Sequence, residues 1–280
     1  MFSLYVTQKA QEGGDRRMQL IGTAASGMRV QQLALDVLGN NIANVNTPGF
    51  KANAVDFAET LAGQMGPGQA PVATGAAGAG AGQGIQVGAG ALYRATGTDF
   101  SQGSLVSSAN PLDLGIEGAG FFTVTLPDGT IAYTRAGNFR PDASGQIVDA
   151  AGNLLSPRVQ VPAGTARITV ASDGTINGAD AQGNPRVLGK IQLALIPNPE
   201  SLNNMGDNLF LPQANTGAIT LGQPGSPGYG QVRSNSLEQS NVDLAQEMTD
   251  MIETQRAYEL NARLVQDGDT MWGLANALRR

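Results

Sequence analysis

Residues 244–272 read LAQEMTDMIETQRAYELNARLVQDGDTMW, and this stretch decides the fold. Steps of four and three residues separate Leu244, Met248, Met251, Gln255, Tyr258, Ala262, Val265, Asp269 and Trp272. Such a stripe indicates one face of a long helix that packs along a partner. We expect the helix to run from about Val242 to Leu278, with Asn241 as its N-cap. At ~1.5 Å per residue its length is about 55 Å, which suits an elongated assembly better than a compact domain.

A second stripe lies near the other end of the chain. Steps of three and four residues separate Met28, Gln31, Leu35, Leu38, Ile42 and Val45. The pattern predicts a helix from about Gln19 to Asn44, which ends at Asn46-Thr47-Pro48-Gly49 because proline disfavours the helix. Packing on an ordinary core explains either stripe alone equally well. Together, at the two ends of a chain with a different middle, they favour termini that pair with each other and then with neighbouring chains.

The middle of the chain has another pattern. Residues 63–90 contain ten glycines and no charged residue, which indicates a flexible or extended connector. After it, apolar residues alternate and turn signals recur, which predicts antiparallel hairpins. We expect a strand at 120–126 to pair with an antiparallel strand at 131–135, and similar hairpins at 142–148 and 167–176. A further strand is expected at 190–196, and the whole region is expected to be barrel-like.

The expected fold class is therefore α+β, with long N- and C-terminal helices that pair as a coiled coil and a mainly antiparallel β middle domain. We divide the chain into a leader at 1–17, an N-terminal helix and turn at 18–62, the connector at 63–90, the β domain at 91–233 and a C-terminal helix at 234–280.

Composition excludes several kinds of chemistry. The chain of 280 residues has no Cys and no His, so it lacks the usual zinc ligands, disulfides and histidine-based nucleophile systems. We expect no catalytic, cofactor-binding or metal-binding residues. A net charge of −6 argues against a nucleic-acid partner, and no apolar run of about 18 residues predicts membrane insertion.

Three strings, in order along the chain, resemble the signatures of one family. The first is Asn40–Lys51, NNIANVNTPGFK; the last comprises Ser240–Asp243, SNVD, and Met251–Glu259, MIETQRAYE. The middle one comprises Ile116–Phe122, IEGAGFF, and Tyr133–Phe139, YTRAGNF. They are similar to the bacterial flagellar rod and hook proteins, above all the distal-rod members. The resemblance covers about Gln19 to Leu278.

This resemblance implies a structural subunit without enzymatic activity. It would polymerise into a hollow helical tube that transmits torque and conducts exported subunits, with the terminal helices lining the channel. The implied location is the flagellar basal body, reached through the type III export apparatus without a cleaved signal peptide. The implied partners are further copies of the chain, other rod and hook subunits, ring proteins and the export apparatus.

Residues 1–17 depart from the family pattern. Family members usually begin a few residues before the first apolar helix positions, and Met18 would fit such a start. The string Glu12–Asp15 can be encoded by a purine-rich stretch like a ribosome-binding site. The leader is thus either not native or an export tail, and Met1 and Met18 both stay open as the start.

The residues expected to carry assembly belong to the two stripes and the turn between them. They are Met28, Leu35, Leu38, Asn41, Ile42, Asn44, Pro48, Phe50, Leu244, Met248, Met251, Gln255, Arg256, Tyr258 and Val265. The asparagines at the end of the first helix serve either as local caps or as contacts to another subunit or helix. The apolar positions carry most of the expected energy, since solvated ion pairs such as one made by Arg256 contribute only ~0.2–1 kcal/mol.

Two alternatives remain open from sequence. One is a proximal-rod or hook member of the same family. The other, much weaker, is a carboxylate-based cell-wall glycosidase that would use two of six middle-domain carboxylates: Asp99, Asp113, Glu117, Asp128, Asp142 and Asp149. Nearly all of them stand in turn signals, and no pair is evident.

Overall fold

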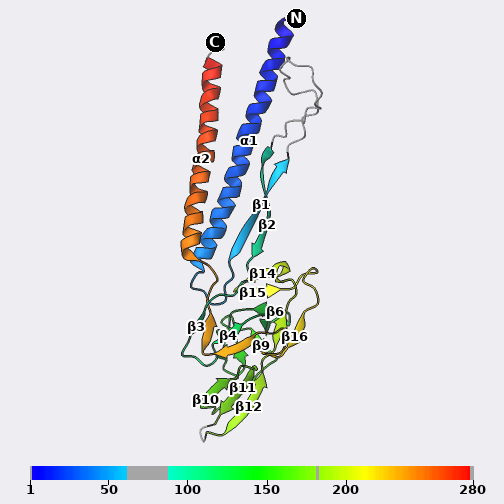
Figure 1. Ribbon diagram of the computed structural model, residues 1–280, viewed down its shortest axis with the longest axis vertical. Helices are drawn as coiled ribbons and strands as arrows, with labels where there is room; N and C mark the ends of the chain where they lie inside the picture. Colours follow the sequence, from blue (N-terminus) through cyan, green and yellow to red (C-terminus); the bar gives the residue numbers. More distant parts are fainter. Residues whose placement is uncertain (1, 62–87, 181–182, 278–280) are drawn as a thin grey trace. The chain divides into compact units, whose positions relative to one another are not determined.

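The computed structural model describes residues 2–61, 88–180 and 183–277 (Figure 1). These residues form two compact units. The helical unit comprises the described residues within 1–39, 54–97 and 246–280. The β unit comprises those within 40–53 and 98–245.

The elements follow one another along the described chain as α1 (Phe2–Ala43), β1 (Asn53–Leu61), β2 (Gly88–Thr98), β3 (Leu105–Ser107), β4 (Leu114–Glu117), β5 (Phe121–Thr125), β6 (Ile131–Thr134), β7 (Arg140–Pro141), β8 (Ile147–Val148), β9 (Leu154–Ser156), β10 (Arg167–Val170), β11 (Thr175–Ala179), β12 (Pro185–Lys190), β13 (Leu193–Leu195), the 3-10 helix η1 (Pro199–Ser201), β14 (Asn203–Gly206), β15 (Leu209–Leu211), β16 (Thr220–Gly222), β17 (Gln231–Ser234), β18 (Ser236–Glu238) and α2 (Leu244–Ala277). The chain is thus α+β, with one long helix toward each end and an antiparallel β middle, as predicted.

The two long helices differ from expectation mainly at their starts. Helix α1 begins at Phe2 rather than near Gln19, so it includes the described part of the expected leader. Helix α2 keeps close to its expected bounds, but its N-cap is Asp243 and not Asn241. The Asp243 carboxylate accepts the backbone N–H of Ala245 at 2.9 Å, which satisfies one of the donors left free at a helix start.

A two-stranded sheet of β1 and β2 belongs largely to the helical unit. Sequence analysis missed β1, whose residues were assigned to the segment of helix and turn. Strand β2 begins at Gly88, before the expected boundary of the β domain. The rest of the expected connector, up to residue 87, lies outside the described residues.

The predicted hairpins are confirmed in the β unit. Strands β5 and β6 pair antiparallel with Phe122 opposite Thr134, and β7 pairs with β8, and β10 with β11, in the same sense. The main sheet runs in the order β14-β15-β6-β5-β9-β8-β7, with β13 joined to both β5 and β16. This order has two ends, so the expectation of a barrel was wrong.

The predicted strand at 190–196 is in fact a crossing between sheets. Lys190 ends β12, which pairs with β11, and Leu193 begins β13, which pairs with β16 and β5. Between them Ile191 is fully buried and donates its backbone N–H to Gly174 O at 2.8 Å. Apolar alternation continues across the crossing because both flanking sheets bury this segment, so the pattern could not reveal the break.

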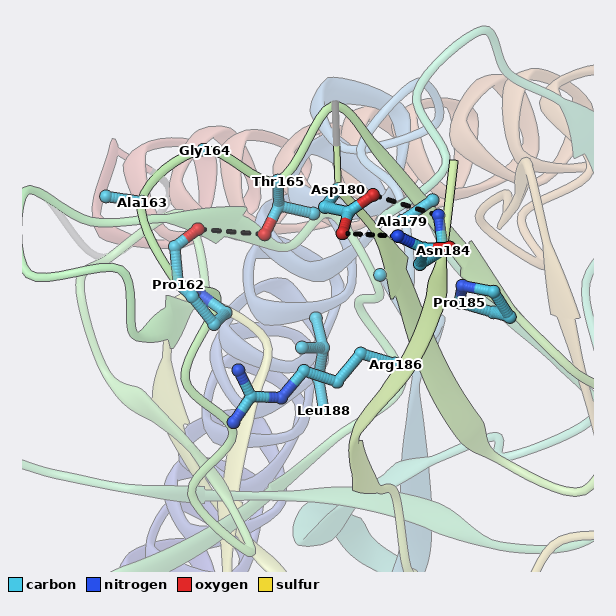
Figure 2. A pocket seen from close by; sticks show the side chains of 11 residues that line it. Pro162, Ala163, Gly164, Thr165, Ala179, Asp180, Asn184, Pro185, Arg186 and Leu188 are labelled. Carbon is cyan, nitrogen blue, oxygen red and sulfur yellow. Dashed lines mark hydrogen bonds between the residues drawn. The ribbon is translucent and has the colours of Figure 1, made fainter. Parts of the chain in front are cut away.

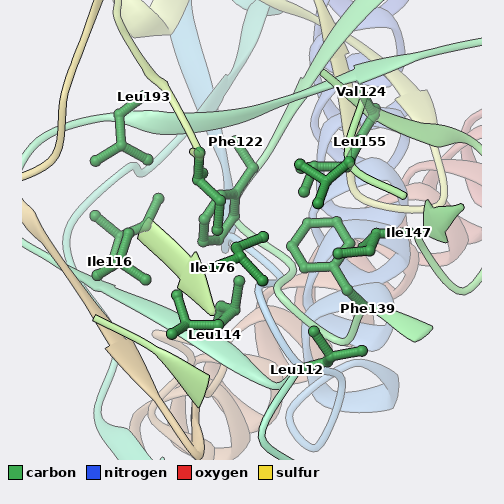
Figure 3. Packing of buried hydrophobic residues seen from close by; sticks show 14 of the residues in the cluster. Leu112, Leu114, Ile116, Phe122, Val124, Phe139, Ile147, Leu155, Ile176 and Leu193 are labelled. Carbon is green, nitrogen blue, oxygen red and sulfur yellow. The ribbon is translucent and has the colours of Figure 1, made fainter. Parts of the chain in front are cut away.

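The core lies on both faces of β5. Phe122 and Val124 point into the larger cluster, in which the rings of Phe122 and Phe139 meet edge to face with centroids 5.3 Å apart (Figure 3). Phe121 points the other way, into a smaller cluster that includes Tyr133. Because successive strand residues face opposite sides, only a strand covered on both faces buries such a run.

Replacing Phe122 by Ala should therefore lower the free energy of unfolding of the β unit by about 3–5 kcal/mol, since it leaves a cavity in the larger cluster, where the ring is fully buried. Urea unfolding followed by near-UV circular dichroism measures this. Ile131→Ala is the matched control, because Ile131 is exposed and its loss should cost on the order of 0.5 kcal/mol. Equal midpoints for the two variants would contradict the placement of this core.

Candidate assembly interface

A broad side of α2, about half of its circumference at ~100° per residue, carries large apolar side chains that stay exposed in the described subunit. These side chains are between 44% and 67% exposed: Leu244, Met248, Ile252, Leu260, Leu264, Met271 and Leu274. We call this set the exposed α2 face. Single exposed apolar residues are ordinary on a protein surface, but a row along one helix marks a contact surface.

The other face of α2 is partly covered within its own unit. Met251, Tyr258 and Val265 are half-buried there. On α1, a Cβ added to Gly27 would lie 3.0 Å from the amide of Asn261, so the two helices touch at that point. The predicted stripe is therefore divided: Leu244 and Met248 belong to the exposed α2 face, and Gln255 is exposed as well. Arg256, which was expected at the interface but lies outside the stripe, is also exposed.

The covered face of α1 is centred on smaller residues than the predicted stripe. Met28, Leu35, Leu38 and Ile42 are only half-buried, whereas Ala24, Val30 and Ala34 are buried. The larger side chains thus flank the covered line. Sequence periodicity identified the helix but not the rotation of its inner face, because small residues contribute weakly to an apolar stripe.

The asparagines at the end of α1 bond within their own chain. Asn41 is buried, and its amide both donates to Asn53 O and accepts Asn53 N–H, each at 2.9 Å. Asn44 donates its side-chain N–H to Asn40 O at 2.9 Å, and its side-chain oxygen accepts the Thr47 hydroxyl. Asn44 is therefore a local cap, while Asn41 links the helix to the strand that follows the turn.

The turn after α1 is packed on the β unit. Gly49 has φ +71°, and a Cβ there would lie 2.4 Å from Ala136 N, so this position needs glycine for both reasons. The Pro48 carbonyl accepts the Asn208 side-chain N–H at 3.1 Å. Phe50 is buried. Pro48 and Phe50 therefore hold the turn against its own subunit.

Three charged side chains are buried next to this turn. Lys51 Nζ donates to Glu238 Oε1 and to Ser101 O, each at 2.6 Å, and neither Lys51 nor Glu238 has any exposed side-chain surface. Gly103 donates its N–H to the same carboxylate oxygen at 3.1 Å. Burial lowers the pKa of Lys51, and the adjacent carboxylate opposes this shift.

Arg135 completes this group, which we call the charge cluster. Its Nη1 donates to Glu238 Oε2 at 3.2 Å and its Nη2 to Gly118 O at 3.0 Å. The guanidinium lies 5.1 Å from the centroid of the Phe121 ring. Desolvation lowers the pKa of Arg135, against the pull of Glu238. One carboxylate thus serves two buried cations from distant parts of the chain.

Asn241 acts beside the charge cluster and not at the start of α2. Its side-chain oxygen accepts the Ala52 N–H at 2.8 Å, and its amide nitrogen donates to Asp99 O and Ser101 Oγ, each at 2.9 Å. The amide therefore ties together the segment after α1, the segment after β2 and the segment before α2. No signal in a single sequence distinguishes this use from a helix cap.

The six carboxylates considered for a glycosidase are engaged in turns and ion pairs. Asp128 and Asp142 accept backbone N–H groups two residues on, at 2.8 Å each. The Thr130 N–H lowers the pKa of Asp128, and the Ser144 hydroxyl, followed by the Gln146 N–H, lowers the pKa of Asp142. Since a lowered pKa favours the charged form, these turn contacts persist at neutral pH and weaken only as pH falls through the lowered value. Glu117 pairs with Arg233 at 2.6 Å on the surface.

The remaining three carboxylates are used in a similar way. Asp99 accepts Ser101 N–H at 2.8 Å, Asp113 accepts the Asn110 amide at 2.9 Å and the Ser108 hydroxyl, and Asp149 accepts Asn153 N–H at 2.8 Å. Within the described part of the chain, no three His, Cys, Asp or Glu side chains gather as a metal would require.

A cavity of about 420 Å³ lies at the β10–β12 sheet (Figure 2). Asn184 bonds to the Asp180 carboxylate through both its backbone N–H and its amide, at 2.9 and 3.1 Å, and Thr165 donates to Pro162 O. Arg186 and Leu188 form another wall. The Asp180 carboxylate on its wall is thus engaged by Asn184 of the same loop.

None of the helices in the described part of the chain combines the length and the apolar character of a membrane span.

Comparison with known families matches three segments of the chain. Residues 21–51 match the flagella basal body rod proteins, residues 115–178 the D1 domain of the flagellar hook proteins FlgE/F/G, and residues 233–278 the C-terminal part of the flagellar basal-body rod proteins FlgEFG. These segments contain the later part of α1 and its turn, strands β5 to β10 with parts of β4 and β11, and all of α2. They define the chain as a flagellar rod or hook protein.

Relatives narrow this class. The chain is 41% identical to the flagellar basal-body rod protein FlgG of Caulobacter vibrioides, over 94% of this chain and all of that protein. It is 38% identical to FlgG of Borreliella burgdorferi, over 94% of this chain and 99% of that one. The flagellar hook protein FlgE of Brucella suis is 33% identical over 65% of this chain and 43% of its own length. The protein therefore belongs to the flagellar basal-body rod protein family.

Sequence analysis missed Lys51, Arg135 and Glu238 as a unit. Lys51 and Arg135 stood inside the quoted strings, and Glu238 stands just before SNVD, but their separation along the chain hid the contact.

Asn241→Ala should destabilise the β unit by about 1–3 kcal/mol, since it leaves the Ala52 N–H without this acceptor and removes two donated bonds. Urea midpoints of the full chain measure this. Asn203→Ala is the matched control, because Asn203 is exposed on strand β14. Indistinguishable midpoints for the two variants would show that Asn241 does not tie these segments.

Proposed function

We propose that the protein is the distal-rod subunit of the flagellum, which polymerises into a hollow helical tube that transmits torque and conducts exported subunits. The protein is a structural subunit of the flagellar basal-body rod, and we assign it to the distal part of that rod. The observation that supports the distal position is the match to FlgG along nearly the whole chain. A proximal-rod or hook role is less well supported, since the hook protein matches over a smaller share of both chains.

We also propose that the protein is not an enzyme. Its relatives are structural, and each of the six carboxylates considered already binds a neighbouring turn or cation. Glycoside hydrolysis needs an opposed pair of carboxylates, whereas these six are engaged in turn and ion-pair contacts.

The exposed α2 face supports assembly with further copies of the chain. Burying a large apolar side chain contributes roughly 1.5–3 kcal/mol, so seven such positions repeated along a tube give a large total. Pairing of α1 with α2 as a coiled coil would present this face outward from each subunit. Met28, Leu35, Leu38 and Ile42, which are only half-buried, would complete contacts with the same neighbours.

Other rod and hook subunits, ring proteins and the export apparatus are the remaining proposed partners. Export without a cleaved signal peptide is consistent with the lack of cysteine, since the chain needs no disulfide chemistry after delivery. Imaging of native basal bodies with a labelled subunit tests the position: label between the proximal rod and the hook is expected, and label confined to either of those parts would refute the distal assignment.

Leu264→Asp should block assembly while leaving the isolated subunit folded, because Leu264 is 60% exposed in the subunit and would be buried against a neighbour. Complementation of a strain that lacks the gene measures this by motility and by counting rods in electron micrographs. The β unit should unfold at the same urea concentration as the wild type.

Asn203→Asp is the matched control, since it adds the same charge at an exposed position on β14, outside α2. It should assemble. Met251→Asp changes the half-buried side of α2, so it should lower helix stability as well as assembly. Normal rods from Leu264→Asp would refute the role of the exposed α2 face.

A further inference from the structure

Strand pairing makes the β unit depend on a segment near its end. Strand β4 pairs with β17, with Ile116 opposite Val232, and β3 pairs with β18, with Leu105 opposite Glu238. These are the partner strands that β3 and β4 have within the described residues. Ile116 is fully buried in the larger core cluster together with Val232. Residues 231–238 therefore supply one side of a core whose other residues come earlier in the chain.

The charge cluster sharpens this dependence. Lys51 and Arg135 are buried in the β unit, and the carboxylate that both contact is Glu238, which is 187 and 103 residues away from them. Before Glu238 docks, closing the core would bury two cations without a counter-charge. An uncompensated buried charge is far more costly than a buried ion pair. In a chain that ends before residue 238, this cost favours the unfolded state of the β unit.

A surface ion pair would not have this effect. The pair between Glu117 and Arg233 also joins distant parts of the chain, 116 residues apart, but its side chains are 49% and 59% exposed, so water solvates either partner alone. The chain thus offers a buried and an exposed long-range ion pair within the same unit.

We propose that Glu238 is the residue that closes the β unit, so that strands β4 to β9 remain unfolded until residues 231–238 have been delivered. The charge cluster is then a folding gate that keeps a partly delivered chain extended. The role of this gate in the cell, which is to keep the chain extended during delivery, rests on the proposed export. The order in which the strands fold does not depend on export.

Pulsed hydrogen exchange during refolding of the full chain from urea tests the order. In the wild type, the amides of β5 and β6 should gain protection in the same phase as those of β18. Protection of β5 and β6 in an earlier phase would overturn the proposal, whatever any variant does.

Glu238→Gln keeps the shape of the side chain but removes its charge. It should lower the folding equilibrium constant of the β unit by at least ~100-fold and slow protection of all these strands together. Glu117→Gln is the matched control and should change the constant by no more than about fivefold. Equal effects of the two variants would refute a special role for the buried carboxylate.

Replacing all three charges, as Lys51→Met, Arg135→Met and Glu238→Met, separates the charge cluster from strand topology. Apolar replacement of a buried ion group is often neutral or stabilising, so this variant should fold. Without cations to compensate, β5 and β6 should now gain protection before β18. If their protection still coincides with that of β18, strand pairing alone sets the order and the charge gate is refuted. Absence of the protein from flagellar rods would instead refute the proposed function and leave this order untouched.

Discussion

The position of Glu238 constrains the β unit more than any other single side chain. Its carboxylate bonds to Lys51 and Arg135, and its backbone carbonyl accepts the Gly49 N–H at 2.8 Å. The turn after α1, the end of β6 and the segment before α2 therefore meet at one residue. Because a buried carboxylate tolerates little change in its partners, the three segments are fixed together or not at all.

In the described part of the chain, the helical unit buries less apolar surface than the β unit does. Its described contacts involve small residues such as Ala24, Gly27 and Ala34, and much of its apolar surface remains outside. Stability from packing scales with the apolar area removed from water, so exposed apolar side chains such as those of α2 contribute little to the stability of the single chain. The β unit buries its core within the single chain, whereas we propose that the helical unit covers its apolar surface by assembly.

Much of the fold could be predicted from sequence, for reasons that are local. The long helices follow from stripes with steps of three and four residues, and the turns Pro127–Thr130 and Asp142–Gly145 give the hairpins. Failures occurred where one signal had two physical origins. Alternation at 190–196 covers two strands in separate sheets. Asn241 has the side chain of a helix cap, but it bonds to the segment after α1 instead.

The candidate site was predicted only in part. Periodicity identifies which helices are amphipathic, but the inner face of α1 is set by small side chains that hardly enter an apolar pattern. The charge cluster was out of reach, because nothing local marks Lys51 and Glu238 as partners across most of the chain. A single sequence carries no record of such long-range pairs.

The exposed α2 face includes two thioethers, Met248 at 52% and Met271 at 60% exposure. Oxidants convert accessible thioethers to polar sulfoxides, while a covered side chain is shielded. A free subunit thus exposes to oxidation the same surface through which we propose that it polymerises. Sulfoxide content along α2 would then record whether a given molecule met oxidant before or after it was built into a rod.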